Sequence, residues 1–337
     1  MQRMKIKTLS LLAALLLTLI ACEPLVPTPQ SVVITATPPP PTPTFTPSPS
    51  PTVTVTPTLT TTPPPPTPTR EPCAETEGVL LETSFRSNYL KTDVPYRIYF
   101  PPCYLQTQRR YPYVLLLHGL EATGQTPLTG QQWLDLGVIA ALERGLQFGR
   151  LPPMALVIPD GGAASASNVF GRDESYENVI LEEVLPEIES EGSGYCLWAK
   201  REGRAIAGIS RGGFWAFEIA FRHPEVFSAV AGHSPFFDPQ VPADYDPIAL
   251  AESQPAEYLN SLRIMFDHGT DDYVQADVRR FSNALGARHI EHDYVVNPVG
   301  EHNDEYWSNH VSEYLAFYGA TWPRDPYELP SCLEPVE

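Results

Sequence analysis

Short apolar runs alternate with longer helical patterns along most of the chain, and this alternation restricts the possible folds most strongly. Residues 113–117, Tyr-Val-Leu-Leu-Leu, are continuously apolar, which is typical of a strand buried on both faces. Strands that alternate with amphipathic helices imply βαβ units and a mostly parallel sheet. We therefore expect an α/β fold with helices on both faces of the sheet.

The pattern places one α/β domain in residues 73–337, with no internal repeat. The expected strands are residues 96–100, 113–117, 155–158, 203–209, 227–231, 263–266 and 293–296. The expected helices are residues 133–146, 176–188, 212–221, 275–285 and 305–318.

The N-terminus has the pattern of an export signal. A basic start at Arg3, Lys5 and Lys7 precedes an apolar run over residues 9–20, which is short for a membrane span and typical of a signal peptide. The run ends in Leu-Ile-Ala-Cys22, which resembles a bacterial lipobox and predicts that residues 1–22 end in a lipidated Cys22. The alternative is a plain secretory signal with a chance cysteine.

Residues 23–72 are rich in proline and threonine and hold 18 of the 38 prolines. Such a segment cannot bury a core and favours extended polyproline geometry. We expect a stiff stalk that reaches on the order of 150 Å at about 3.1 Å per residue. Together with the lipobox, it predicts a domain held outside a bacterial membrane.

Acidic residues dominate the expected domain. The chain has a formal charge of −18, and residues 73–337, with 18 Lys+Arg and 38 Asp+Glu, carry −20. This charge should repel nucleic acid and anionic lipid surfaces. We expect no nucleic-acid partner, and membrane contact only through the lipid anchor.

Four cysteines besides Cys22 predict two disulfides in an exported chain, with three possible connectivities. We favour Cys73–Cys103 and Cys196–Cys332; unpaired buried thiols are the alternative. The sequence has no Cys-x-x-Cys motif, so neither a zinc ribbon nor a redox motif is expected. No metal or cofactor is predicted.

The motif Gly208-Ile-Ser-Arg-Gly212 lies between an expected strand and an expected helix. A serine on such a tight turn exposes its hydroxyl above the sheet, and the glycines allow strand and helix to pass closely. This context favours Ser210 as a nucleophile over an ordinary turn residue.

A serine nucleophile needs a base, and the base needs an acid that orients it. His302 follows the last expected strand, at the sheet edge that carries Ser210. His289 and His292 precede that strand, and His310 lies within the next helix, so His302 is the predicted base.

The acid candidates follow the strand at residues 263–266. We prefer Asp272 over Asp271, since either could instead cap the next helix; Asp267 is too close to the strand.

Backbone N–H groups must also face the developing oxyanion. We predict Arg211, directly after the nucleophile, and Leu120, in the loop after residues 113–117; His118 in that loop is expected to be structural.

The substrate pocket is the least constrained part of the prediction. Asp160 and residues 165–170 are expected to line it. Aromatic walls are expected from Trp133, Phe236, Phe237 and Trp307, although such residues more often pack in a core.

Seven short motifs occur in order along residues 75–320. They are Tyr-Arg-Ile-Tyr-Phe-Pro-Pro at 96–102, Leu-Leu-Leu-His-Gly at 115–119, Val-Ile-Pro-Asp-Gly at 157–161, Glu-Glu-Val-Leu-Pro at 182–186, Ala-Gly-Ile-Ser-Arg-Gly-Gly at 207–213, His-Gly-Thr-Asp-Asp at 268–272 and Gly-Glu-His at 300–302. With them the chain resembles the esterase D and feruloyl-esterase branch of the α/β-hydrolases, which is related to enterochelin esterases and mycolyltransferases.

The resemblance implies an α/β-hydrolase fold in which Ser210, Asp272 and His302 form the catalytic triad. Leu120 and Arg211 would supply the oxyanion hole, and the substrate would be a small-molecule or glycan ester. The acid position varies within this branch, so Asp271 stays open. An acyltransferase with the same triad, or an inactive binding module held at a surface, are the alternatives to an esterase.

Overall fold

The computed structural model describes residues 73–121 and 126–334. The predicted signal peptide, the lipidation of Cys22 and the predicted stalk over residues 23–72 lie outside the described residues. No helix in the described part of the chain is both long enough and apolar enough to cross a membrane.

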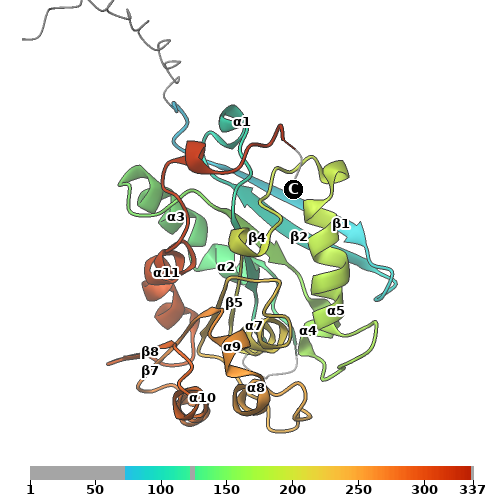
Figure 1. The fold of residues 1–337 in the computed structure, drawn as a ribbon, viewed down its shortest axis with the longest axis vertical. Helices are drawn as coiled ribbons and strands as arrows, with labels where there is room; N and C mark the ends of the chain where they lie inside the picture. Colours follow the sequence, from blue (N-terminus) through green and yellow to red (C-terminus); the bar gives the residue numbers. More distant parts are fainter. Residues whose placement is uncertain (1–72, 122–125, 335–337) are drawn as a thin grey trace, which may run out of the picture. The chain divides into compact units, whose positions relative to one another are not determined.

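An eight-stranded sheet forms the centre of the fold, in the order β1-β2-β4-β3-β5-β6-β7-β8 (Figure 1). From β4 to β8 all neighbouring strands are parallel, whereas β2 runs antiparallel to both β4 and β1. The strands are β1 (Val79–Arg86), β2 (Asp93–Phe100), β3 (Tyr113–Leu117), β4 (Ala155–Pro159), β5 (Arg204–Ile209), β6 (Ala229–His233), β7 (Arg263–Gly269) and β8 (Asp293–Asn297).

Side chains alternate between two cores, one on each face of the sheet. In β3, Val114 and Leu116 pack into the core beneath α2, α3 and α11, and Leu115 and Leu117 pack into the other core. That second core lies beneath α5, α7, α8 and α10. The two-sided burial explains the continuously apolar strands and confirms the predicted α/β fold.

Helices cover both faces, and several of them are interrupted. They are α1 (Tyr104–Thr107), α2 (Gln131–Asp135), α3 (Val138–Gln147), α4 (Gly162–Ala166), α5 (Tyr176–Asn178), α6 (Leu185–Glu189), α7 (Arg211–Arg222), α8 (Pro247–Ser253), α9 (Ala256–Leu259), α10 (Gln275–Ala287) and α11 (Asp304–Tyr318). The single helix predicted over 133–146 is wrong: Gly137, at φ 77°, separates α2 from α3. The helix predicted over 176–188 instead contains a π-helical stretch, Val179–Val184, between α5 and α6.

Two further differences concern strands. The sequence does not predict β1, whose side chains are mostly exposed because it is the edge strand and gives no buried apolar run. The strand predicted over 227–231 begins two residues too early, because Phe227 packs into the core before β6 starts.

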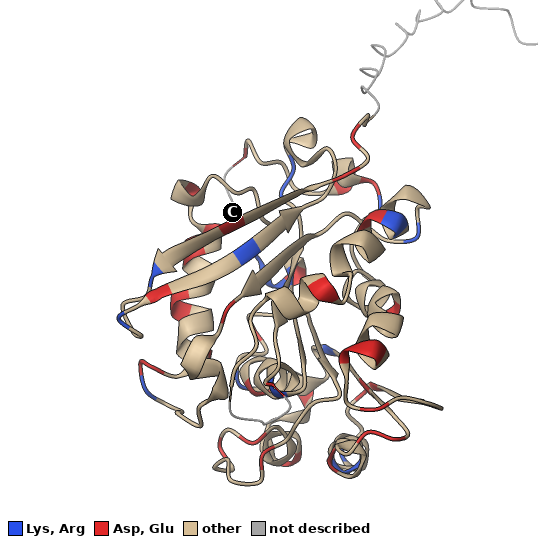
Figure 2. Ribbon diagram, turned by 180° about the vertical axis from the view of Figure 1, so that it is seen from behind, with Lys and Arg blue, Asp and Glu red and all other residues tan. Residues whose placement is uncertain are grey.

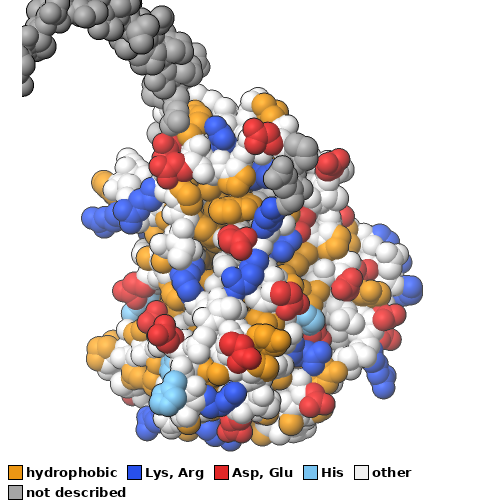
Figure 3. Space-filling view, viewed as in Figure 1, with side chains coloured by type: hydrophobic (Ala, Val, Ile, Leu, Met, Phe, Trp, Pro, Cys, Tyr) orange, Lys and Arg blue, Asp and Glu red, His pale blue; other side chains and the backbone are white. Residues whose placement is uncertain are grey.

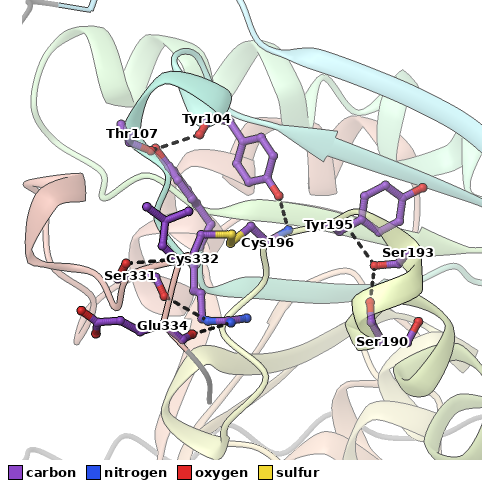
Figure 4. The surroundings of a disulfide bond; sticks show 12 residues. Tyr104, Thr107, Ser190, Ser193, Tyr195, Cys196, Ser331, Cys332 and Glu334 are labelled. Atoms are coloured by element: carbon purple, nitrogen blue, oxygen red, sulfur yellow. Dashed lines mark hydrogen bonds between the residues drawn. A yellow bond between two sulfur atoms is a disulfide. The ribbon is translucent and has the colours of Figure 1, made fainter. Parts of the chain in front are cut away.

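Both predicted cysteine pairs lie at bonding distance, with Cα–Cα separations of 5.8 Å for Cys73–Cys103 and 5.9 Å for Cys196–Cys332. Figure 4 shows the second bridge, beside which the Cys196 N–H donates to the Tyr104 hydroxyl. This bridge joins the segment before β5 to the last described residues.

The loops at the two ends of the strands have different roles. The carboxyl ends of the parallel strands lead into the loops that carry Ser210, Asp272 and His302. Because β2 runs antiparallel to β4, its end at Phe100 lies at the opposite edge, and Cys103 follows it there. Seen from behind, acidic residues are spread over many helices and loops (Figure 2), and on the face in Figure 3 both signs of charge are interspersed with hydrophobic side chains.

Candidate active site

Ser210 occupies a strained turn between β5 and α7. Its backbone has φ 53° and ψ −116°, a conformation that non-glycine residues rarely adopt. Its N–H donates to the His233 carbonyl at 2.9 Å, and its carbonyl accepts from the Phe236 N–H at 3.0 Å. These two hydrogen bonds, one to the end of β6 and one to the segment after it, hold the turn.

The glycines on either side of Ser210 are required by close backbone approach. A Cβ atom at Gly208 would lie 2.1 Å from the carbonyl carbon of Gly212. A Cβ atom at Gly212 would lie 2.3 Å from the Leu117 carbonyl oxygen. The strand–turn–helix geometry therefore brings the Ser210 turn directly against the end of β3.

Ser210, His302 and Asp272 form a continuous hydrogen-bonded chain. His302 Nε2 lies 2.8 Å from Ser210 Oγ, and His302 Nδ1 lies 2.9 Å from Asp272 Oδ1. Ser210 is 8% exposed and Asp272 is fully buried. A hydroxyl, an imidazole and a carboxylate in this order can pass a proton from oxygen to nitrogen and stabilise the resulting imidazolium.

Asp272 is held in the ionised form. Burial by itself raises the pKa of its carboxyl, but the hydrogen bond from His302, the charge of that ring and the N–H of Val274 together lower this pKa below its ordinary value. Asp271 instead has an exposed side chain, and its N–H donates to the Gly300 carbonyl at 3.0 Å. The structure thus brings Asp272, and not Asp271, to His302.

The acid and histidine loops are packed against each other through glycines. A Cβ atom at Gly269 would lie 2.2 Å from the Gly300 carbonyl oxygen, and Gly300 itself has φ 131°. The Thr270 N–H donates to the Asn297 carbonyl at 3.1 Å. Substitution at either glycine would separate the loop that carries Asp272 from the loop that carries His302.

The two predicted oxyanion donors, Arg211 and Leu120, line the same cavity as Ser210. Arg211 is the first residue of α7, where an N–H has no partner within the helix. Leu120 forms a bridge with Pro127 whose hydrogen bonds are made by Gly119 and Glu121, so the Leu120 N–H points to the other side. A Cβ atom at Gly119 would lie 3.4 Å from Ser210 Cβ, so this loop contacts the nucleophile.

A buried glutamine that the sequence analysis did not identify supports this loop. Gln132 Oε1 accepts from the Gly119 N–H at 2.9 Å, and Gln132 Nε2 donates to Asp304 Oδ1 at 3.1 Å. The next residue, Trp133, donates from its indole to the Leu117 carbonyl at 3.1 Å. In the sequence, the one indication of this supporting role is a polar residue at a position of the helix that faces the core.

Residues from several of these loops line a cavity of about 540 Å³ above Ser210. The ring of Tyr273 lies 4.4 Å from that of His302, and Trp307 meets His302 edge-on at 5.1 Å. The lining residues are Leu120, Glu121, Leu128, Gln132, Ser210, Arg211, Phe236, Tyr273, His302, Asn303, Asp304 and Trp307. Larger and smaller cavities exist elsewhere in the described residues, so the chemistry of its walls, not volume, distinguishes this one.

Several of the expected pocket residues lie elsewhere: the cavity is not lined by Trp133, Phe237, Asp160 or residues 165–170. In that segment the Ser165 carbonyl accepts from the Trp215 indole at 2.7 Å, and the Ser167 carbonyl accepts from Arg211 at 2.8 Å. Trp133 is fully buried in the core beneath α2 and α3, because its indole is used to bind the Leu117 carbonyl. Phe237 is also a core residue. Asp160 binds Arg97 at 3.0 Å and the Gly130 N–H at 2.5 Å, so it supports the start of α2 beside a separate cavity. Phe236 and Trp307 do line the pocket.

Two other histidines, His118 and His233, are held by structural partners. His118 Nε2 accepts from the Gly161 N–H at 2.8 Å, and burial lowers the pKa of its ring. His233 is completely buried, with Nδ1 2.7 Å from Asp267 Oδ1, and the other oxygen of Asp267 accepts from Tyr314 at 2.9 Å. This second Asp–His pair ties β6 and β7 to α11 beneath the active site and has no access to the pocket.

Among the described residues no group of three or more His, Cys, Asp or Glu side chains is placed to hold a metal ion.

A parallel sheet with a serine on a strained turn after β5, followed by an acid and a histidine at the same edge, defines the α/β-hydrolase class. A family described as "Putative esterase" matches residues 87–322. The chain belongs to this esterase family.

Solved structures with this fold include a ferulic acid esterase, at 24% identity and a TM-score of 0.63, over 72% of this chain and 99% of that one. An S-formylglutathione hydrolase from Staphylococcus aureus is similar at 17% identity and a TM-score of 0.59, over 72% and 99% of the two chains. At these identities the likeness shows the fold alone.

Curated relatives include an esterase of Mycobacterium tuberculosis strain H37Rv and one of strain CDC 1551 / Oshkosh. Each is 30% identical over 141 residues, which are 41% of this chain and 28% of the relative. The match therefore spans little more than a quarter of the length of these relatives.

Proposed function

We propose that the protein is a serine esterase that acts through Ser210, His302 and Asp272 and forms an acyl-enzyme intermediate. The observation that carries the proposal is the hydrogen-bonded chain from Ser210 Oγ to His302 Nε2 at 2.8 Å and from His302 Nδ1 to Asp272 at 2.9 Å. The ordered geometry of all three side chains favours a working catalyst over an inactive binding module.

In the first half of the reaction, His302 Nε2 takes the Ser210 proton as Oγ attacks the ester carbonyl carbon. The N–H groups of Leu120 and Arg211 stabilise the oxyanion, a contribution worth about 10²- to 10³-fold in rate for a single donor. Collapse of the tetrahedral intermediate breaks the bond to the alcohol oxygen, which takes the proton from His302.

In the second half, His302 removes a proton from water, and the hydroxide attacks the acyl-enzyme carbonyl. Collapse releases the carboxylic acid and returns the proton to Ser210 Oγ. Ionised Asp272 stabilises the imidazolium in both halves and fixes the tautomer of His302.

We further propose that the natural esters are acylated carbohydrates or feruloyl-type esters, and that the enzyme works outside the cell, lipid-anchored at Cys22. The aromatic side chains of Phe236, Tyr273 and Trp307 in the pocket support an aromatic or sugar substrate. The sequence patterns of residues 1–22 and 23–72 support the location.

The decisive experiment compares the wild type with Ser210→Ala on p-nitrophenyl acetate and on a panel of feruloyl and acetyl-glycan esters. The variant should retain the fold and lose turnover by roughly 10⁴-fold or more. Wild-type rates in a folded Ser210→Ala protein would overturn the assignment of the nucleophile. Transfer of the acyl group to an added glycan, in place of release as free acid, would show an acyltransferase.

A further inference from the structure

The walls of the pocket are negatively charged. Glu121 and Asp304 both line it, and both have exposed side chains at its mouth. Asp304 is fixed there by the hydrogen bond from Gln132. The described lining residues include no lysine, and Arg211 is their one permanently cationic side chain.

The Arg211 guanidinium is already engaged by the protein. It donates to the Ser167 carbonyl at 2.8 Å and to Asn168 Oδ1 at 2.6 Å, and it lies 4.2 Å from the ring centre of Phe214. Arg211 is 3% exposed, and burial lowers the pKa of its guanidinium to about 10. It therefore cannot turn into the pocket to neutralise a substrate anion without breaking these contacts.

The sequence of the loop that carries Glu121, residues 119–130, contains no lysine or arginine. Glu121 is followed by Ala-Thr-Gly-Gln at 122–125, which adds no charge, and residues 73–337 as a whole carry −20. The positive end of α7 acts at the oxyanion position itself. A negative charge elsewhere on a bound ester would meet two carboxylates and, among the described residues that line the pocket, no available counter-charge.

From this arrangement we propose that the pocket selects uncharged or cationic esters and discriminates against anionic ones, with Glu121 and Asp304 as the specificity-determining residues. The inference rests on the proposed esterase function and names a substrate class for it. The aromatic rings of Tyr273 and Trp307 in the lining suit an apolar group, a sugar or a cation, but not a carboxylate.

The test uses two matched series of esters that differ in charge only. For the acyl side, 4-nitrophenyl levulinate is compared with 4-nitrophenyl hemisuccinate. For the alcohol side, 3,3-dimethylbutyl acetate is compared with acetylcholine and with 2-acetoxyethanesulfonate. The measured quantity is the ratio of kcat/KM for the uncharged ester to kcat/KM for the anionic ester of the same series. We expect this ratio to be about 10 in at least one series at low salt. In 0.5 M NaCl it should decrease, because salt screens exposed charges.

The double variant Glu121→Gln/Asp304→Asn should reduce this ratio to within about twofold, since both carboxylates are removed while the new amide at position 304 keeps an oxygen that can accept from Gln132. The matched control is Glu202→Gln/Glu257→Gln, which removes the same charge from exposed residues that precede the amino ends of β5 and β7. The control should keep the wild-type ratio.

The outcomes separate the two proposals. If no ester in either series is hydrolysed, or if Ser210→Ala is as active as the wild type, the proposed function fails. If the wild type hydrolyses neutral and anionic members equally well in both series, or if the control variant changes the ratio as much as the pocket variant does, charge selection by Glu121 and Asp304 is refuted while the esterase stands.

Discussion

The side-chain oxygen of Gln132 accepts a hydrogen bond from the N–H of Gly119, one residue before the proposed oxyanion donor Leu120. A side chain of α2 thus sets the direction of a peptide in the loop after β3. The other end of the same amide holds Asp304 at the start of α11, directly after the loop of His302. One buried amide therefore connects the two loops on either side of Ser210.

Gln132→Met should lower kcat roughly 10- to 100-fold with a smaller change in KM, because the loop loses its support but keeps both oxyanion N–H groups. Steady-state kinetics on p-nitrophenyl acetate measure kcat and KM separately, and thermal unfolding reports any loss of stability. Gln131→Met is the matched control on the same helix, since the Gln131 side chain is exposed and its one hydrogen bond among the described residues is to Asp135 at 2.8 Å. Equal effects of the two substitutions would exclude a positioning role for Gln132.

Asp272→Asn should reduce kcat by about 10³- to 10⁴-fold, because the amide cannot stabilise the imidazolium or hold the productive tautomer of His302. Asp271→Asn should stay within about threefold of the wild type, since its side chain is exposed and does not reach His302. The comparison is made on one ester at one pH. A large loss in the Asp271 variant with little loss in the Asp272 variant would reverse the assignment.

Glu218 should make the protein less stable as the pH rises. Both carboxyl oxygens are buried without a hydrogen bond, and burial raises the pKa of this group well above its ordinary value, with a further increase from Glu177. A raised carboxyl pKa stabilises the fold below the unfolded pKa of about 4.3, and this stability is lost as the pH rises toward the folded pKa, by about 1.4 kcal/mol per pH unit.

Glu218→Gln removes this titration, so its melting temperature relative to the wild type should increase between pH 4.5 and pH 8. Thermal unfolding at closely spaced pH values checks the trend. The control is Glu225→Gln, whose side chain is exposed on the loop after α7. A constant difference between the Glu218 variant and the wild type over the whole range would contradict the prediction.

Loss of the Cys196–Cys332 bridge should destabilise the domain more than loss of the Cys73–Cys103 bridge. Their sequence separations are 136 and 30 residues, which correspond to about 5 and 3.6 kcal/mol of chain entropy in the unfolded state. Denaturant unfolding of the two Cys→Ser double variants measures how much unfolding free energy is lost with each bridge. Unchanged stability in both variants would show that the bridges do not form in the native protein.

The sequence predicted the meeting of Ser210, Asp272 and His302 better than it predicted which residues line the cavity beside them. Ser210, Asp272 and His302 follow strands whose apolar runs are unambiguous, and parallel strands bring such loops to a single edge. The role of Trp133 could not be predicted in the same way. The sequence around a tryptophan near a loop is the same whether its indole lines a cavity or donates to a backbone carbonyl. The break at Gly137 and the exposed edge strand β1 were missed because neither disturbs the apolar pattern.

The residues that shape the pocket were harder to identify for a related reason. Tyr273 is adjacent to Asp272, and Asp304 is near His302, but adjacency in sequence does not say which side chain faces the cavity. Gln132 acts through backbone groups of residues far from it in the chain. Such contacts depend on how α2 and α11 pack over the sheet, which no local pattern encodes.

The position of Cys73 also has a mechanical meaning. The described domain starts at the edge of the sheet opposite Ser210, and the bridge to Cys103 connects this start to the residues just after β2. A pull on the chain from before Cys73 would therefore reach the domain at this disulfide, at the ends of the strands opposite to Ser210. Tension applied there would act first on the bridge to the residues after β2, away from the loops of Ser210, Asp272 and His302.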